Sequence, residues 1–584
     1  MNILVLVKPS AESSNISFKK DMTLNRQANK LILDMADAHA LALARTMKKM
    51  AGGTITVLTL APGYPSRLIE QLQSQDTDAL YHICDSAFAG GDCLATAAVL
   101  AAAVRYIEKK QETLFDLILT GSRSTDAETG QVPGETAAIL SVPVITNVQD
   151  IAYVKGKMLF SRVLEDCVQE LSCPDCCVVS CTPKGFELAP PSLAGLARAS
   201  LVPYIKLTNT ELKIPAASIG FRGSPTRVIQ CSLKMQQWRK PRWIFNAKEG
   251  ASIIRIETAK CKKHAPVQSQ PLLTRGAGDD TLYVLCPLDD STGWYTALEI
   301  LSHLTVLGKS ARAAAFGKRL DTDRIEELNT AGAYAVDYIS IDWNTDDALT
   351  GICLARYLQD KSGIVLCASS IRMRAAVPVC AALLHAGITA DCTGIAFSDQ
   401  GFIQSRPAFG GTTQADIISK GKLCFSTIRP HVYSFSAVKP VKSLPVFNIN
   451  GNYTSRIILE KQSPIEQINS EDIPVIFSIG AGVKDPEYRK RIESFGLPMG
   501  ASRKAVNLFG LPYAWQVGQT GRIVHCDLYV AFGISGAEQH ISGISSVQKI
   551  IAVNNDRSAP VFSYSDVAVC CDIEDVVTAL ERDS

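Results

Sequence analysis

The chain has 584 residues, more than one hydrophobic core usually serves, so several domains are expected. Its composition is that of an ordinary globular protein, with 47% hydrophobic and 20% charged residues. Lysines and arginines number 59 against 57 aspartates and glutamates, which gives a formal net charge of +2. This balance gives no reason to expect nucleic acid or an anionic membrane as the main partner.

The apolar runs are too short to cross a membrane. The longest, residues 94–104, ends at Arg105, well short of the ~20 residues that a transmembrane helix needs. Residues 2–7 lack the basic stretch and the cleavage site of a signal peptide, and are expected to form a first strand. The 18 cysteines are scattered, as in a reducing compartment. We therefore expect a soluble, cytoplasmic protein without membrane insertion.

One cluster of cysteines, Cys173, Cys176, Cys177 and Cys181, is denser than the rest. A zinc or iron–sulfur site would need further ligands at suitable spacing, and none follows. The intervening Val178-Val179 favours a buried strand in which cysteine acts as a small hydrophobe, so no metal site is predicted.

In chain order, short Val/Ile/Leu-rich runs alternate with amphipathic segments, which is typical of parallel strands joined by crossover helices. The first part predicts strands at 3–7, 54–60 and 117–120 and helices at 34–50 and 92–109. The pattern restarts with strands at 282–286, 312–316 and 364–367 and a helix near 294–307. It restarts again with strands at 475–478, 528–532 and 549–553 and a helix near 486–495. The fold class is therefore α/β, with three doubly wound parallel-sheet domains.

The predicted domains span residues 1–235, 280–445 and 473–584. Residues 236–279 mix basic residues, Gln, Pro and Gly with little periodicity, and are expected to be a linker or arm. Residues 446–472 are polar and are expected to be a second linker. The first two domains begin alike, either through duplication or through a shared architecture alone.

Three loops of the third domain follow its strands, where α/β sheets bind ligands. In the first, Ser502 is a plausible N-cap, and Arg503 lies in the first helical turn, a poor place for a cation unless an anion is near. The second, residues 516–521, contains two glycines that allow backbone amides to approach a ligand, and Gln and Thr side chains that can supply hydrogen bonds. The third, residues 533–540, is a Gly-rich turn that opens a helix and exposes N–H groups to a phosphate.

Together these loops resemble the FAD-binding domain of the electron transfer flavoprotein α subunit. That domain carries Gly-Ala-Ser-Arg, Val-Gly-Gln-Thr-Gly and Gly-Ile-Ser-Gly-x-x-Gln-His in this order, and the match continues through Asn554, Ala559-Pro560 and Asp566. The resemblance implies a Rossmann-like domain that binds FAD. One departure is Ala481, which stands where the family usually has an Arg contact.

The same resemblance implies roles for individual residues. Arg503 would lie against the isoalloxazine ring, Thr520 would reach its N5 edge, and His540 would donate to its N1/O2 edge. A cation and donors beside the ring would favour the reduced, anionic flavin. Asn554 and Asp566 would bind the adenosine half. Further contacts would come from Ser502, Val517, Gly518 and Gln519, and those to the pyrophosphate from Ser535, Gly536, Ala537, Glu538 and Gln539.

The other two domains extend the resemblance. Residues 389–394 and 404–411 match the N-terminal domain of the α subunit, although Arg406 could be purely structural. Residues 117–132 and 223–228 match the β subunit. The chain thus resembles β and α subunits fused in that order, whereas the family usually has two chains.

The resemblance also implies a second nucleotide in the β-like domain. It would be held by the loop after Thr120, through Gly121, Asp126, Thr129, Gly130, Gln131 and Val132. Ordinary members bind AMP there, and others bind a second FAD. FAD is favoured over AMP because Asp126, Thr129, Gln131 and Val132 match the FAD-binding pattern, although Pro133-Gly134 reverses its final pair.

Residues 190–199 resemble the loop of the β subunit that docks on dehydrogenases, in which Leu193 would anchor in the partner. The alternative is a helix end packed on its own domain. The predicted function is an FAD-containing carrier that takes electrons from a flavin dehydrogenase, for which an acyl-CoA dehydrogenase is favoured, and passes them to a second redox partner. Two alternatives stay open: a two-FAD electron-bifurcating component that oxidises NADH, and a non-redox adenine-nucleotide sensor.

Overall fold

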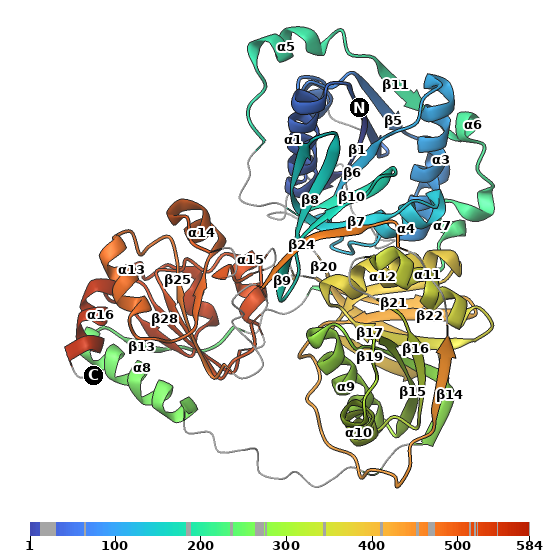
Figure 1. Cartoon of the computed structure of the whole chain (residues 1–584). Coiled ribbons are helices and arrows are strands. Elements are labelled where there is room, and N and C mark those ends of the chain that lie inside the picture. The colour runs from blue at the N-terminus through green and yellow to red at the C-terminus, as the bar shows by residue number, and fades with distance from the viewer. Residues whose placement is uncertain are drawn as a thin grey trace. The chain divides into compact units, whose positions relative to one another are not determined.

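The computed structural model divides the chain into two compact units (Figure 1). Unit 1 comprises Met1–Ser232, Pro271–Phe409 and Thr413–Pro464, and unit 2 comprises Leu233–Gln270, Gly410–Thr412 and Ile465–Ser584. The structure describes residues 1–11, 31–63, 66–182, 188–233, 238–262, 274, 277–342, 346–408, 411, 413–450, 455–464, 473–512, 515–518, 521–522, 524–545 and 547–582.

The first half of unit 1 is built on a ten-stranded sheet in the order β11-β5-β4-β1-β6-β10-β7-β8-β9-β24. The strands from β11 to β7 are parallel, and β7, β8, β9 and β24 are antiparallel. Their bounds are β1 Asn2–Val7, β4 Thr54–Leu60, β5 Ala79–Ile83, β6 Leu117–Gly121, β7 Val144–Val154, β8 Lys157–Val163, β9 Cys167–Ser172, β10 Cys177–Cys181, β11 Tyr204–Leu207 and β24 Ile458–Pro464. A separate antiparallel pair is formed by β2 Pro9–Ala11 and β3 Leu31–Leu33.

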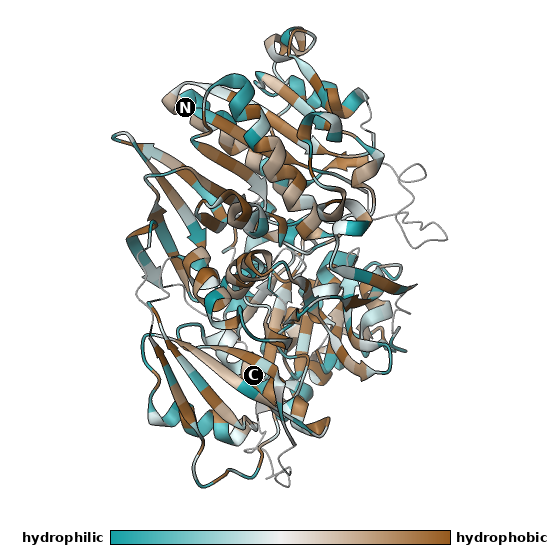
Figure 2. Cartoon of the chain, turned by 90° about the vertical axis from the view of Figure 1, so that its right-hand side faces the viewer, coloured by the Kyte–Doolittle hydropathy of each residue, from teal (hydrophilic) through white to brown (hydrophobic). Residues whose placement is uncertain are grey.

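The central strands of this sheet are buried on both faces, which is why they read as continuous apolar runs (Figure 2). Cys177 and Cys181 lie fully buried in β10. The helices of this half are α1 Met35–Ala51, α2 Ser66–Gln73, α3 Cys93–Gln111, α4 Val132–Leu140, α5 Leu193–Ala199, α6 Asn209–Leu212 and α7 Gly220–Gly223. Both long helices begin at an aspartate whose side chain accepts from a backbone amide of the first turn, Asp34 for α1 and Asp92 for α3.

The second half of unit 1 has a seven-stranded parallel sheet in the order β18-β22-β17-β14-β15-β16-β23. Its strands are β14 Ala277–Pro287, β15 Lys309–Gly317, β16 Ala335–Ser340, β17 Gly363–Ala368, β18 Gly387–Cys392, β22 Leu423–Ile428 and β23 Val446–Asn450. Its helices are α9 Ser291–Val306, α10 Thr322–Ala331, α11 Asp347–Leu358 and α12 Ile371–Leu383. A four-stranded sheet beside it contains β12 Thr226–Leu233, β21 Thr413–Ser419, β20 Gly401–Ala408 and β19 Gly394–Ser398.

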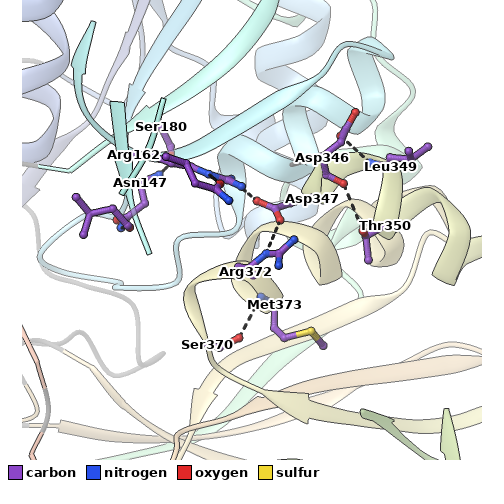
Figure 3. A network of polar contacts seen from close by, with 12 residues as sticks. Asn147, Arg162, Ser180, Asp346, Asp347, Leu349, Thr350, Ser370, Arg372 and Met373 are labelled. Atoms are coloured by element: carbon purple, nitrogen blue, oxygen red, sulfur yellow. Dashed lines mark hydrogen bonds and ion pairs between the residues drawn. The ribbon is translucent and has the colours of Figure 1, made fainter. Parts of the chain in front are cut away.

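The two halves of unit 1 are joined by buried ion pairs (Figure 3). Arg162 of β8 places Nη1 2.6 Å from Oδ2 of Asp347, the first residue of α11, and both side chains are fully buried. Arg372 of α12 approaches the other carboxylate oxygen of Asp347, with Nε at 3.4 Å. Helix α4 of the first half packs on α12 of the second. Because buried charges are tolerated only when paired, this network fixes how the two halves meet.

Unit 2 is a six-stranded parallel sheet in the order β13-β29-β28-β27-β25-β26. Its strands are β13 Arg242–Ile244, β25 Val475–Ile479, β26 Met499–Ala501, β27 Leu528–Phe532, β28 Lys549–Val553 and β29 Val567–Val569. Its helices are α8 Ala247–Lys262, α13 Pro486–Glu493, α14 Arg503–Phe509, α15 Glu538–Ile541 and α16 Ile573–Arg582.

The two ranges expected to be linkers contain regular structure. Within 236–279, β13 pairs with β29 and α8 buries Ala251 and Ile254 in the core of unit 2. Within 446–472, β23 pairs with β16 and β24 pairs with β9. These are short edge strands, and β24 is almost wholly exposed, so they carry little of the apolar pattern that marks a strand in the sequence.

Among the residues that the structure describes, no helix is both long and apolar enough to span a membrane.

Candidate functional site

Unit 1 contains a cavity of about 1230 Å³, partly open to solvent, at the carboxyl ends of β1, β4, β5 and β6. Loops that follow these strands form one wall, and residues of β18 and β20 from the second half form the other. The carboxyl edge of a parallel sheet is where α/β proteins bind ligands. Five predicted site residues line the cavity, namely Gly121, Thr129, Gly130, Gln131 and Val132.

The start of the loop after β6 is held by Asp37 of α1. This carboxylate accepts the amides of Gly121, at 3.0 Å, and Lys8, at 2.8 Å. A Cβ at position 121 would lie 2.4 Å from Asp37 Oδ1, so only glycine fits. Burial, reinforced by the nearby Asp34, raises the pKa of Asp37 to about 8.

The rest of this loop is fixed by side chains. Asp126 does not line the cavity; it is buried and bonded to Lys8 Nζ at 2.5 Å. Burial alone would raise the pKa of Asp126, but the Lys8 charge and hydrogen bonds from Lys8, Ser124 and the Ala127 amide hold it below its ordinary value. Gln131 Nε2 donates to the Ile388 carbonyl at 3.2 Å, which ties the loop to β18.

Three buried polar side chains that line the cavity carry atoms without a hydrogen-bond partner among the described residues. The atoms are Oε2 of Glu135, Oγ1 of Thr389, and Nε and Nη2 of Arg406. These three residues are only 1%, 2% and 6% exposed, respectively. Burial, and then the charge of Asp92, raise the pKa of the Glu135 carboxyl well above its ordinary range. Because buried polar groups are normally bonded, these atoms fit a polar ligand.

Sequence reasoning missed Glu135 and gave Thr389 no role. A single acid within the otherwise apolar α4 was a signal for Glu135. Thr389 and Arg406 lie on strands of the second half, and only the fold brings them to the loop after β6.

In unit 2 the predicted site residues that the structure describes lie at the carboxyl edge of the sheet, with the exception of Asp566. Ser502 caps α14 by accepting the Ala505 amide at 3.3 Å, and half-buried Arg503 is the first residue of that helix. Val517, buried, donates its amide to the Ala501 carbonyl at 2.9 Å. Gln519 and Thr520 lie outside the described residues.

At two of the glycines another backbone segment comes too close to leave room for a side chain. Gly518 has φ +137°, and a Cβ there would lie 2.6 Å from the Gln539 carbonyl oxygen. Gly536 has φ +89°, and a Cβ there would lie 2.2 Å from the Val561 amide nitrogen. Around Gly536, the turn between β27 and α15 leaves Ser535, Ala537, Glu538 and Gln539 exposed. Ala481 lies between Gly480 and Gly482, and the backbones of both glycines pack closely against the backbone of Gly533.

His540 is buried, and both ring nitrogens are bonded within the protein. Nδ1 lies 3.0 Å from the Val517 carbonyl, which can only accept, so Nδ1 carries the proton. Nε2 then accepts from the Tyr529 hydroxyl at 3.0 Å. Burial lowers the pKa of His540 to about 4, so the ring is neutral at pH 7. The ring of His540 thus links the Val517 segment to Tyr529 of β27. Its expected contact with the N1/O2 edge of a flavin stays a prediction.

The two residues expected at the adenosine half are not brought together. Asn554 follows β28 at the carboxyl edge and donates Nδ2 to the Ile534 carbonyl at 3.1 Å. Asp566 precedes β29 at the opposite edge, where it accepts the Ile550 amide and pairs with Arg239. Asp572, which follows β29, is an acid at the carboxyl edge and accepts from Asn555 Nδ2 at 2.8 Å. Its position just after a strand was the available signal.

Helix α5 presents apolar side chains to solvent. Ser192 caps it, and its buried residues Gly195 and Ala199 pack on the domain. Leu193 is 87% exposed, and Leu196 and Leu201 are exposed as well. One face of the helix packs on its own domain, and Leu193 is exposed to solvent. Docking of a dehydrogenase at Leu193 stays a prediction.

Parallel sheets whose loops form candidate ligand sites at the carboxyl edge are typical of nucleotide-binding α/β proteins. Comparison with known families makes this specific. Residues 21–206 and 326–451 match the electron transfer flavoprotein domain, and residues 469–545 match the electron transfer flavoprotein FAD-binding domain. The chain therefore belongs to the electron transfer flavoprotein family, with β-like and α-like parts fused in one chain. The second match supports FAD as the ligand of unit 2.

Curated relatives agree with this assignment. The acryloyl-CoA reductase electron transfer subunit beta of Anaerotignum propionicum is 28% identical over 51% of this chain and 93% of its own. The electron transfer flavoprotein subunit alpha of Thermoanaerobacterium thermosaccharolyticum is 32% identical over 38% and 70%, respectively. Protein FixB of Clostridium saccharobutylicum is 29% identical over 47% and 90%.

Proposed function

We propose that this chain is an electron carrier that holds FAD in unit 2, accepts electrons from an acyl-CoA dehydrogenase and passes them to a second redox partner. The proposal rests on one observation: the region that matches the FAD-binding domain contains the loops at the carboxyl edge of the unit 2 sheet. This match, residues 469–545, covers the loops where Arg503 and the Gly536 turn lie. The name of one relative, acryloyl-CoA reductase electron transfer subunit beta, supports a partner that acts on acyl-CoA.

In unit 2, bound FAD would supply the capacity to take up and release electrons. The residues of the chain would hold and tune it. Arg503 would place a positive charge beside the ring, which stabilises the negative charge that develops on reduction. The exposed turn at Ser535–Gln539 would offer backbone amides to the pyrophosphate. His540 would fix the loop that contains Val517. Contacts from Gln519 and Thr520 remain predictions.

We propose that the cavity of unit 1 binds the second nucleotide, and that this nucleotide is FAD rather than AMP. The volume of about 1230 Å³ exceeds the range of about 300–1,000 Å³ usual for small-ligand pockets, which favours the larger molecule. The unpartnered atoms of Glu135, Thr389 and Arg406 would then be bonded by the nucleotide. Both halves of unit 1 would contribute, so the cavity would be complete only when β-like and α-like parts are present.

We propose that the dehydrogenase docks on Leu193. An exposed leucine anchored in a partner pocket is a typical interface hot spot. Leu193→Ala should reduce the rate at which the dehydrogenase, loaded with its acyl-CoA substrate, bleaches the bound flavin, by roughly tenfold or more. Stability and flavin absorbance should not change. Leu114→Ala is the matched control, because Leu114 is also strongly exposed but lies between α3 and β6.

Stopped-flow absorbance with purified dehydrogenase measures this rate. Equal rates for the wild-type chain and Leu193→Ala would remove α5 from the interface. If no acyl-CoA dehydrogenase bleaches the flavin, the partner assignment is wrong.

The size of the unit 1 cavity favours one alternative function, a two-FAD bifurcating component that oxidises NADH. Anaerobic addition of NADH alone distinguishes the two. Bleaching of the flavin by NADH supports the bifurcating component, and an unchanged spectrum supports the simple carrier.

A further inference from the structure

The edge strand of unit 2 carries an exposed pair of aromatic rings. Trp243 and Phe245 are 38% and 60% exposed, and their rings stack with centroids 6.0 Å apart and planes inclined by 9°. Ile244 between them is buried in the core, so the two rings share the opposite face of β13. Large aromatic side chains left in solvent side by side usually mark a binding surface.

The pair lies at the carboxyl edge, beside the loop that follows β28. Arg557 of that loop places its guanidinium 5.6 Å from the Trp243 ring centroid and 5.5 Å from that of Phe245. Trp243 also contacts Phe562, with centroids 5.0 Å apart. The Cys570 amide just after β29 donates to the Ile244 carbonyl at 2.8 Å, which fixes the register of β13 against β29. The aromatic platform is defined as Trp243, Phe245 and Arg557.

The order of features along this edge indicates what the platform binds. The Gly-rich turn after β27 lies in the middle and suits a pyrophosphate. On one side, after β26, is the cation Arg503; on the other, after β28 and beside β13, is the platform. A dinucleotide with its phosphates in the middle extends its two ring systems to opposite sides. The ring that gains negative charge on reduction belongs beside Arg503, and the neutral adenine then faces the platform.

We propose that the platform of Trp243, Phe245 and Arg557 stacks the adenine of FAD. Purine bases stack favourably on aromatic faces and on guanidinium planes. This inference rests on the proposed function, because it assumes FAD in unit 2. It gives the segment between the β-like and α-like parts a role in the cofactor site, beyond joining those parts.

Titration of flavin-free full-length protein with FAD and with FMN, which lacks the adenosine, tests the platform. Phe245→Ala and Arg557→Ala should each weaken FAD binding in unit 2 by about tenfold and leave FMN binding unchanged. Trp243→Phe, which keeps an aromatic face, should bind FAD within about twofold of wild type, since stacking tolerates the exchange. Ile256→Ala is the control, because Ile256 is exposed on α8 of the same segment. The unit 1 cavity contains none of these residues and serves as an internal reference.

Unchanged FAD affinity in both alanine variants would overturn the proposal that the platform stacks adenine. Equal losses for FAD and FMN would also overturn it, because the flavin ring would then be the group that stacks there. A wild-type chain that binds neither flavin in unit 2 would contradict the proposed function, and the platform with it.

Discussion

The cavity of unit 1 and the carboxyl edge of unit 2 differ in how their polar side chains are bonded. In unit 1, Glu135, Thr389 and Arg406 carry buried atoms that have no partner among the described residues. In unit 2, His540 bonds through both ring nitrogens, and its site relies on backbone turns with closely fitted glycines. A ligand of the unit 1 cavity would therefore bond side-chain atoms of the chain, whereas the exposed turn of unit 2 offers mainly backbone amides.

The largest difference in stability is expected between two matched substitutions of buried arginines in unit 1. Arg162→Met breaks the pair with Asp347 and should lower the free energy of unfolding by roughly 3–5 kcal/mol, since a buried carboxylate loses its shortest contact. Arg406→Met removes atoms without a partner and should leave the nucleotide-free chain unchanged or up to about 2 kcal/mol more stable. The Arg406 variant should also lose the second nucleotide.

Chemical denaturation of nucleotide-free protein measures both changes. Equal destabilisation by the two variants would show that Arg406 is structural. The contrast between the sites would then fail.

Glycine substitutions test the close fit of the unit 2 turn. Gly536→Ala places a Cβ 2.2 Å from the Val561 amide at φ +89° and should destabilise unit 2 by roughly 2–5 kcal/mol. Gly496→Ala is the matched control, because Gly496 has φ +65° with nothing within 4 Å, so only backbone strain of roughly 1 kcal/mol is expected. Thermal unfolding and FAD content report the difference. Similar losses in both variants would mean that the turn has room for a side chain.

The two units should respond to pH in opposite directions. Burial lowers the pKa of His540 from 6.5 to about 4 on folding, so its stabilisation is complete above pH 6.5 and is lost as pH falls towards 4. Burial, with the charge of Asp34, raises the pKa of Asp37 from 3.8 to about 8, so its contribution is complete below pH 3.8 and is lost as pH rises towards 8. Acidification from pH 7.5 to 5.5 should therefore weaken unit 2 around His540 by roughly 1 kcal/mol and strengthen unit 1 around α1.

Amide hydrogen exchange, corrected for its intrinsic pH dependence, resolves the two regions. His540→Gln should abolish the acid loss in unit 2 and leave α1 unaffected. Changes of the same sign in both regions would contradict the opposed titrations.

Most of the fold followed from local patterns in the sequence. Strands buried on both faces, such as β4 and β27, have the bounds expected from their apolar runs. Edge strands β13 and β24 escaped notice because exposed strands alternate polar and apolar residues weakly, and their partners lie far away in the chain. Sequence reasoning placed the glycine loops at strand ends, because turn chemistry is local.

The site was harder to predict wherever a residue acts through long-range contacts. Nothing local shows that His540 bonds to Val517 and Tyr529, or that Asp566 precedes its strand and pairs with Arg239. Thr389 and Arg406 meet the loop after β6 only through the packing of the two halves of unit 1. Such roles depend on tertiary structure, which a motif in one segment does not encode.

The central claim is that one chain holds a flavin in unit 2 and a second nucleotide in the unit 1 cavity. Quantifying the nucleotides released by denaturing the purified full-length protein tests it most directly. We predict two FAD per chain, falling to one in Arg406→Met. One FAD with one AMP would overturn the choice of FAD for the cavity. A colourless protein that releases only AMP or ATP would contradict the electron-carrier account and favour the sensor.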